Sequence, residues 1–134
     1  MKLENQIELD HCVIASTDLD RTDDFYARVF GAVIEKPLAN FRQYRIGRHM
    51  LNVHGPGLAA IAPPDLLATL PVAPGGSDLC FEWKGSAAEL DRHLEDCGVT
   101  VTVGPVSREG ARGTGTSVYF RDPDGSLLEF IIYG

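Results

Sequence analysis

The sequence is poor in cysteine and offers no disulfide framework. Its 134 residues include three cysteines, Cys12, Cys80 and Cys97, an odd number without a Cys-x-x-Cys spacing. Each lies in an apolar stretch, so we expect small buried hydrophobic side chains in a reducing compartment. The N-terminal residues also lack the apolar core of a signal peptide, which predicts a cytoplasmic protein.

Long hydrophobic runs and an excess of positive charge are missing as well. No apolar run is long enough for a membrane span, so no membrane partner is expected. The 12 lysine and arginine residues face 19 aspartate and glutamate residues, and the net charge of −7 would repel nucleic acid. The 44% hydrophobic and 23% charged content is typical of one globular domain over residues 1–134.

The hydrophobic pattern predicts the same order of elements twice. The first module, about residues 6–55, shows a strand, a helix that ends at Gly31, and three strands. The second module, about residues 77–134, shows a strand, a helix from a capping box at Ser86 to Gly98, and further strands. This order predicts an internal βαβββ repeat. The expected strands cover residues 7–15, 32–39, 41–46, 50–54, 77–83 and 99–103, and a glycine-rich loop is expected over 104–116.

The linker between the modules, residues 56–76, is rich in proline and glycine, with one helical turn expected near residues 65–70. It also contains many apolar residues, among them Leu58, Ile61 and Leu70. This is too apolar for a solvated tether. We therefore expect the linker to pack on the domain.

Residues 118–133 predict a closing β-hairpin. The run Asp122-Pro123-Asp124-Gly125 has turn chemistry: a fixed φ, a residue that tolerates positive φ, and side chains that bond the local backbone. Apolar runs on both sides are typical of hairpin arms. The second arm contains one charge, Glu129. Because a buried lone carboxylate is costly, we expect a cation or a metal ion opposite Glu129.

Four residues of types that bind metal ions lie on corresponding strands of the two modules. His11 and Asp78 are equivalent on the two first strands (11 + 67 = 78), and His54 and Glu129 lie on the last strands. Two imidazoles and one carboxylate suit Fe²⁺ or a similar ion, whereas a fourth ligand suits Mn, Ni, Zn or Mg. We predict a metal site of His11, His54 and Glu129, with Asp78 left open as a fourth ligand. A core histidine or an ion pair of Glu129 with an arginine is the structural alternative.

The chain resembles the vicinal oxygen chelate superfamily, which includes glyoxalase I, extradiol dioxygenases, bleomycin-binding proteins and fosfomycin-modifying thiol transferases. The resemblance rests on Asp10-His11, on residues 25–31, on residues 51–54 and on the run from Phe120 to Glu129. It is most similar to the small proteins of the glyoxalase domain-containing protein 5 group. The resemblance implies an α+β fold, in which two βαβββ modules form a cupped, incomplete mixed β-barrel with helices outside. It also implies a homodimer and a divalent metal ion on His11, His54 and Glu129.

The final hairpin is also similar to the extradiol dioxygenase signature, Tyr-x-x-Asp-Pro-x-Gly-x-x-x-Glu, from Tyr119 to Glu129. The resemblance implies that Tyr119 contacts the substrate, and we predict Tyr119 and Asp78 as catalytic residues. Where the signature has Gly-x-His, this chain ends in Arg112, which cannot shuttle a proton near neutral pH. We predict that Arg112 binds an anionic part of the substrate, with Arg108 as a second contact. The alternative is that both arginines only solubilise a mobile loop.

The function predicted from these residues is a metal-dependent enzyme acting on a small oxygen-bearing substrate, with Fe²⁺, Mn²⁺, Ni²⁺ or Zn²⁺ as the ion. The final hairpin favours extradiol dioxygenase-like chemistry, whereas the missing histidine and Asp78 favour a glyoxalase I-like lyase or isomerase. A metal-free small-molecule binding (resistance) module is an alternative of another class. The sequence leaves open whether the modules pair within one chain or swap across a dimer.

Overall fold

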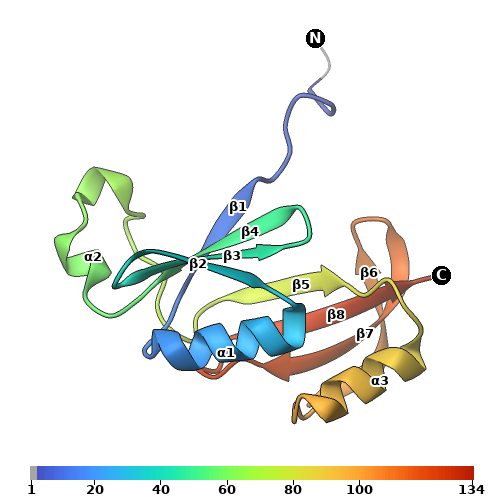
Figure 1. The fold of residues 1–134 in the computed structure, drawn as a ribbon. Coiled ribbons are helices and arrows are strands. Elements are labelled where there is room, and N and C mark those ends of the chain that lie inside the picture. The colour runs from blue at the N-terminus through green and yellow to red at the C-terminus, as the bar shows by residue number, and fades with distance from the viewer. Residues whose placement is uncertain (1–2) are drawn as a thin grey trace. The chain divides into compact units, whose positions relative to one another are not determined.

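In the computed structural model, which describes residues 3–134, the chain divides into two compact units inside the linker (Figure 1). Unit 1 extends to Val72 and unit 2 begins at Ala73. Each unit contains one open, mixed sheet of four strands and one long helix, so the fold is α+β as the sequence predicts. No helix among the described residues is long and apolar enough to cross a membrane.

Unit 1 has the sheet order β1-β4-β3-β2, in which β1 and β4 are parallel and the other neighbours antiparallel. Its elements are β1 (His11–Ala15), α1 (Leu19–Phe30), β2 (Val33–Leu38), β3 (Phe41–Ile46) and β4 (His49–His54). Helix α1 begins after Asp18, whose side chain accepts the Arg21 backbone N–H at 3.2 Å. It ends where Gly31 takes a positive φ of 65°, as predicted.

The linker forms α2 (Leu58–Ile61) and a 3₁₀ turn (Pro64–Leu66). The expectation that it packs on the domain is wrong, because Ile61, Leu66 and Leu70 are 75, 78 and 87% exposed. The linker's five prolines lack an N–H donor and fix φ, so no strand or long helix forms that could hold these side chains against a sheet.

Unit 2 repeats the same order of pairing as β5-β8-β7-β6. Its elements are β5 (Asp78–Glu82), α3 (Ala87–Asp96), β6 (Val103–Gly110), β7 (Gly113–Arg121) and β8 (Leu127–Tyr133). The capping box is confirmed, since Ser86 and Glu89 exchange side-chain to backbone hydrogen bonds at the start of α3. The closing turn is confirmed as well, because the Asp122 carboxylate accepts the backbone N–H groups of Asp124 and Ser126.

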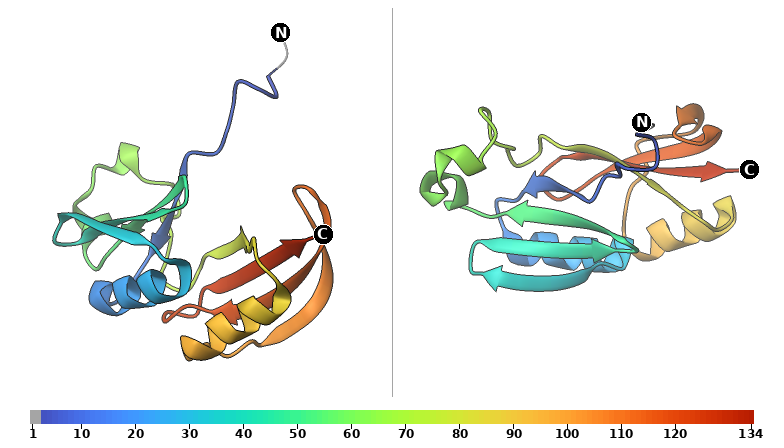
Figure 2. Two further views of the ribbon diagram at one scale, coloured as in Figure 1. Left: turned by 45° about the vertical axis from the view of Figure 1, so that its right-hand side comes forward. Right: turned by 90° about the horizontal axis from the view of Figure 1, so that it is seen from above.

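The predicted strand over residues 99–103 and loop over 104–116 are wrong, because β6 and β7 form a hairpin there (Figure 2). Glycine and polar residues are poor strand formers, which hides the hairpin in the sequence. Packing explains one of the glycines. A Cβ at Gly115 would lie 2.7 Å from Ile131 Cγ1 and 2.8 Å from the Ile132 carbonyl oxygen.

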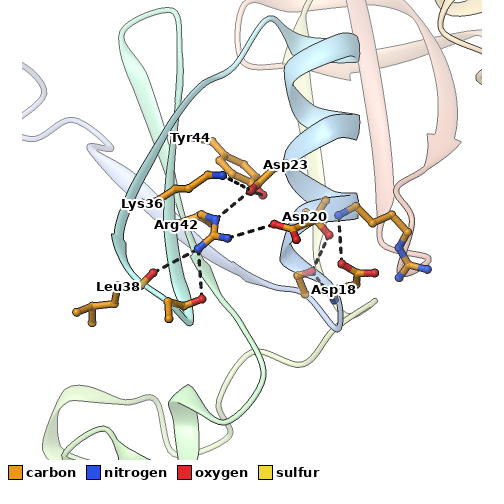
Figure 3. A network of polar contacts seen from close by, with 11 residues as sticks. Asp18, Asp20, Asp23, Lys36, Leu38, Arg42 and Tyr44 are labelled. Carbon is orange, nitrogen blue, oxygen red and sulfur yellow. Dashed lines mark hydrogen bonds and ion pairs between the residues drawn. The ribbon is translucent and has the colours of Figure 1, made fainter.

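The core of unit 1 combines aromatic rings with a buried ion pair beneath α1 (Figure 3). Tyr26 of α1 lies 5.3 Å from the Tyr44 ring of β3, and both are fully buried. Arg42 Nε lies 3.0 Å from Asp23 Oδ2, and Tyr44 Oη donates to Asp23 Oδ1 at 2.7 Å. The guanidinium also donates to the carbonyls of Leu38 and Ala39. These bonds connect α1 to β3 and to the β2–β3 turn.

The core of unit 2 beneath α3 is apolar. Leu90 and Leu94 of the helix are buried at 2 and 1% exposure. Phe120 of β7 and Phe130 of β8 stack with their ring centres 5.5 Å apart. His93 of α3 stacks on the Trp83 ring, with the ring centres 5.3 Å apart.

Candidate functional site

Each sheet has one face that carries its own unit's helix and one face that does not, which we call the helix-free face. In unit 1 the helix side is identified by Arg42 and Tyr44, which contact α1. Alternation along the strands then places the residues of the other parity on the helix-free face. Three rows of register partners cross it: His11–Met50–Arg45, Val13–Asn52–Gln43 and Ala15–His54–Phe41.

The helix-free face of unit 2 is defined in the same way, since Phe120 and Phe130 belong to the core beneath α3. Its rows are Asp78–Leu127–Arg121, Cys80–Glu129–Tyr119 and Glu82–Ile131–Ser117. Asp78 and Glu129, two of the residues predicted for the site, lie on this face. The same face also holds Tyr119, the third predicted residue of this unit.

The register of the two units identifies equivalent positions. His11 pairs with Met50 and Asp78 with Leu127, so the first strands are offset by 67 residues and the last strands by 127 − 50 = 77. The counterpart of Glu129 is therefore Asn52 (52 + 77 = 129), and His54 corresponds to Ile131. Sequence reasoning missed Asn52 because it applied one offset, although the hairpin of β6 and β7 is longer than that of β2 and β3.

His11 begins β1, and the neighbouring Asp10 carboxylate orients its imidazole ring, as carboxylates do for many metal-binding histidines. Its Nδ1 lies 2.7 Å from the Asp10 carboxylate, which is an acceptor, so the proton is on Nδ1. In the neutral imidazole the lone pair is then on Nε2, the atom that a metal ion or a substrate proton would meet. The ring is 40% exposed and can be reached from solvent.

His54 ends β4 on the same face, and its ring centre lies 6.1 Å from that of Phe41. Its Nδ1 is buried and has no hydrogen-bond partner among residues 3–134. Burial lowers the pKa of His54, which favours the neutral imidazole. However, the register puts His54 four residues beyond the row of His11, roughly 13 Å along the strand. Within unit 1 the structure does not bring the two rings together.

Glu129 lies at the centre of its row, half-buried. No lysine or arginine forms an ion pair with Glu129 in the described part of the chain. The group that meets it is the Cys80 thiol, which is exposed, contrary to our expectation of a buried cysteine. Partial burial, a hydrogen bond to Glu129 and the charges of Glu129 and Asp78 raise the pKa of Cys80 to about 12. The thiol is therefore protonated near neutral pH, and its Sγ donates to the Phe81 carbonyl oxygen at 3.9 Å.

Tyr119 is the register partner of Glu129 on β7. Arg108 Nε donates to Tyr119 Oη at 3.0 Å, and the guanidinium carbon lies 5.5 Å from the centre of the ring. The phenol keeps its own proton to donate to a ligand, because it is the acceptor in this bond. Tyr119 is therefore held in one orientation beside Glu129.

Arg112 lies in the β6–β7 turn and is paired within its unit. Its Nη2 is 2.7 Å from Glu82 Oε2, and its guanidinium carbon is 4.7 Å from the centre of the Tyr133 ring. The charge of Arg112 is therefore compensated by a carboxylate of the same sheet. Its predicted contact with a substrate stays a prediction.

The predicted residues fall into two groups that the structure describes separately, His11 and His54 in unit 1 and Asp78, Glu129, Tyr119 and Arg112 in unit 2. Within residues 3–134, no three His, Cys, Asp or Glu side chains are placed as a ready metal site. The arrangement that the structure does bring together is the row Cys80–Glu129–Tyr119 with Arg108. It combines a carboxylate, a hydrogen-bond donor and a cation on one face.

No family model matches the chain. It is 38% identical to the glyoxalase domain-containing protein RDO1 of Mycosarcoma maydis, over 93% of this chain and 68% of that protein. A solved integron cassette protein of V. cholerae is 37% identical, with a TM-score of 0.83 over 96% of both chains. These similarities extend across nearly all of the sequence, including both units.

Two further solved proteins show the same fold. A lactoylglutathione lyase of Agrobacterium tumefaciens is 25% identical, with a TM-score of 0.70 over 93% of this chain and 92% of the lyase. The fosfomycin resistance protein FosX of Listeria monocytogenes, solved with Mn(II), is 18% identical, with a TM-score of 0.62 over 92% of this chain and 88% of FosX. The FosX likeness shows the fold alone. From these similarities and the paired βαβββ units, the chain belongs to the glyoxalase-domain proteins of the vicinal oxygen chelate superfamily.

Proposed function

We propose that the chain is a divalent-metal-dependent enzyme that acts on a small oxygen-bearing substrate. The observation that carries the proposal is Glu129, a half-buried carboxylate without a cationic partner among the described residues, beside the oriented phenol of Tyr119. The similarity to a lactoylglutathione lyase supports it.

The donor chemistry of the predicted ligands fits a divalent ion. His11 keeps Nε2 as its lone-pair nitrogen, His54 favours the neutral form, and Glu129 is a carboxylate in need of a cation. We therefore propose that His11 and Glu129 hold the ion, with His54 as the predicted third ligand, although the register leaves His54 roughly 13 Å along the strand from the row of His11. Asn52 competes with His54, because it is the register counterpart of Glu129. Bound, such an ion polarises neighbouring oxygens of a substrate.

The chain's own residues then position the substrate and move a proton. Tyr119 donates a hydrogen bond from its phenol to a substrate oxygen and thereby fixes the orientation of the substrate. Asp78, exposed on the same face, accepts a proton or serves as the fourth ligand.

For the reaction, the adjacency of Tyr119 and Glu129 favours extradiol dioxygenase-like chemistry. A glyoxalase I-like lyase or isomerase is the second candidate, and Arg112 in place of a histidine favours it. Oxygen uptake with a catechol would support the first candidate. Isomerisation of a hemithioacetal without oxygen uptake would support the second.

The first experiment is the metal content of the purified chain, with melting temperatures in EDTA and in Fe²⁺, Mn²⁺, Ni²⁺ and Zn²⁺. An ion at a hundred times its dissociation constant stabilises by about 2.7 kcal/mol, a shift of about 10 °C for a chain of this size. We expect near-stoichiometric metal that is lost in His11→Ala and Glu129→Ala. The control is His49→Ala, which removes an exposed histidine outside the predicted set.

Comparing His54→Ala with Asn52→Ala decides which residue of β4 contributes to the site. Absence of metal, with no thermal shift for any ion, contradicts the enzyme proposal. The metal-free small-molecule binding module would then be the better account. Size-exclusion chromatography with light scattering tests the homodimer that the family resemblance implies.

A further inference from the structure

The helix-free face of unit 2 carries an arginine that is oriented but not neutralised. Arg108 donates from Nε to Tyr119 Oη at 3.0 Å and from Nη1 to the Ser107 carbonyl at 2.9 Å. Its guanidinium also lies over the Tyr119 ring. Within the described residues, no carboxylate forms an ion pair with Arg108.

Arg112 shows what a neutralised arginine looks like in the same unit. Its Nη2 contacts the Glu82 carboxylate at 2.7 Å, so its charge is compensated. The same pair removes Glu82 as a source of repulsion for an incoming anion. Arg121 also lies on this face, but the structure holds it at the closing turn, where Nη1 donates to the Gly125 carbonyl. Arg108 alone of these three contacts Tyr119.

A guanidinium has five N–H donors, and the two hydrogen bonds of Arg108 leave three without a partner among residues 3–134. A planar fork fixed by stacking is suited to two oxygens of a carboxylate or a phosphate, because less side-chain freedom is lost on binding. Arg108 is exposed, so these donors can be reached.

A second polar group of this face lacks a partner. Ser117 is fully buried, and its Oγ makes no hydrogen bond in the described part of the chain. Ser117 lies on β7 midway between Tyr119 and Gly115, the register partner of Arg108. Because Ser117 is 0% exposed, a ligand on the surface does not reach this hydroxyl, and the contact with an anion rests on Arg108.

We propose that Arg108, positioned by Tyr119, binds an oxyanion group of the substrate, a carboxylate or a phosphate-like group. This inference rests on the proposed function, since it places the substrate on the face of Tyr119 and Glu129. It assigns the anion contact to Arg108 instead of Arg112. The net charge of −7 sharpens the assignment, because an acidic chain does not gather anions without a specific cation.

The test is calorimetric titration of the EDTA-treated full chain with inorganic phosphate and, separately, with acetate. Removing the metal makes the result independent of the metal-content experiment, so either proposal can fail alone. We expect saturable binding by the wild type and a loss on the order of tenfold or more in Arg108→Gln. Arg108→Lys keeps the charge but loses the fork, and should recover only part of the affinity. The phosphate and acetate arms distinguish the two kinds of oxyanion.

The matched control is Arg48→Gln, which removes the same charge from the exposed β3–β4 turn of unit 1. We expect its affinity within about twofold of wild type. Arg112→Gln compares the two arginines directly. Loss in Arg112→Gln without loss in Arg108→Gln would overturn the inference in favour of the prediction from sequence. Equal losses in Arg108→Gln and Arg48→Gln, or no binding of either anion by the wild type, would overturn it as well.

Discussion

The two units share their strand order but hold their helices by different chemistry. Under α1 the contact is ionic, with Asp23 and Arg42 at 8 and 7% exposure. The register gives the counterparts in unit 2: Arg42 faces Val53 and Val118 faces Phe130, so a valine replaces the arginine (53 + 77 = 130). A buried ion pair is therefore not required by this βαβββ unit. The fold fixes where a side chain points and leaves its chemistry open.

The largest effect should come from breaking the ionic contact. Arg42→Ala leaves the Asp23 carboxylate buried with only Tyr44 and the exposed Lys36 near it. Removing one partner of a buried pair costs about 3–5 kcal/mol. Urea unfolding should show this loss in the free energy of unfolding of the variant. Arg48→Ala, a control on an exposed arginine, should change it by less than about 0.5 kcal/mol.

A double replacement makes unit 1 resemble unit 2. Because the charges are costly to bury, Asp23→Leu with Arg42→Met should recover most of the stability lost in either single variant. Recovery would show that the ion pair is one solution among several. If the double variant is as unstable as Arg42→Ala, the lost stability comes from the hydrogen bonds of Arg42 to the Leu38 and Ala39 carbonyls and not from the ion pair with α1.

The apolar contact of unit 2 can be broken by a cavity. Leu94→Ala removes a side chain that is 1% exposed beneath α3, and such truncations cost about 2–5 kcal/mol. Leu66→Ala is the matched control, the same substitution at a leucine that is 78% exposed in the linker. The urea midpoint of this control should stay near wild type. A large effect in the control would mean that the linker packs in solution after all.

The tyrosine and phenylalanine at equivalent places allow a reciprocal exchange. Tyr44 faces Leu51 and Phe120 faces Leu128, which are register counterparts (51 + 77 = 128). Tyr44→Phe removes the 2.7 Å bond to the Asp23 carboxylate and should cost about 1.5–3 kcal/mol. Phe120→Tyr buries a hydroxyl in the apolar core and should also cost about 1–3 kcal/mol. Thermal unfolding of both variants would measure the two changes in stability. If Tyr44→Phe does not change the stability, Arg42 alone satisfies the Asp23 carboxylate.

Local chemistry explains which parts of the fold were predictable from the sequence. The Ser86 capping box, the stop at Gly31 and the closing turn at Asp122 each depend on residues a few positions apart, and the structure confirms them. The hairpin of β6 and β7 was missed because its strands are polar and glycine-rich. Two of its glycines, Gly110 and Gly115, are explained by close contacts with β8, which is distant in sequence from β6.

Only those features of the candidate site that follow from the alternation of side chains along a strand were predictable from the sequence. Period two placed Glu129 and Asp78 on one face without any knowledge of register. The equivalence of Asn52 and Glu129 depends on strand pairing, as does the placement of Tyr119 beside Glu129. Arg112 is paired with a carboxylate and Arg108 is not. This difference depends on the contact between Arg112 and Glu82, which are 30 residues apart in the sequence.

The smallest expected effect is a pH dependence of the stability that the capping box of α3 contributes to unit 2. Hydrogen bonds from the Ser86 backbone and side chain lower the pKa of Glu89 from its ordinary value of 4.5. A carboxyl group with a lowered folded-state pKa stabilises the folded state above its unfolded value, and this contribution is lost as pH falls through the folded value. The stability difference between wild type and Glu89→Ala should therefore shrink in urea unfolding as pH falls below about 4.5.

Two variants show whether that dependence belongs to the capping box. Glu89→Gln can still accept the Ser86 backbone N–H but carries no charge, so its stability should change less with pH than that of wild type. Glu95→Ala removes an exposed carboxylate from the same helix outside the cap, and should keep the wild-type dependence. If Glu89→Gln follows wild type through the transition, the pH dependence arises elsewhere. The cap would then stabilise α3 through hydrogen bonds that do not depend on the charge of Glu89.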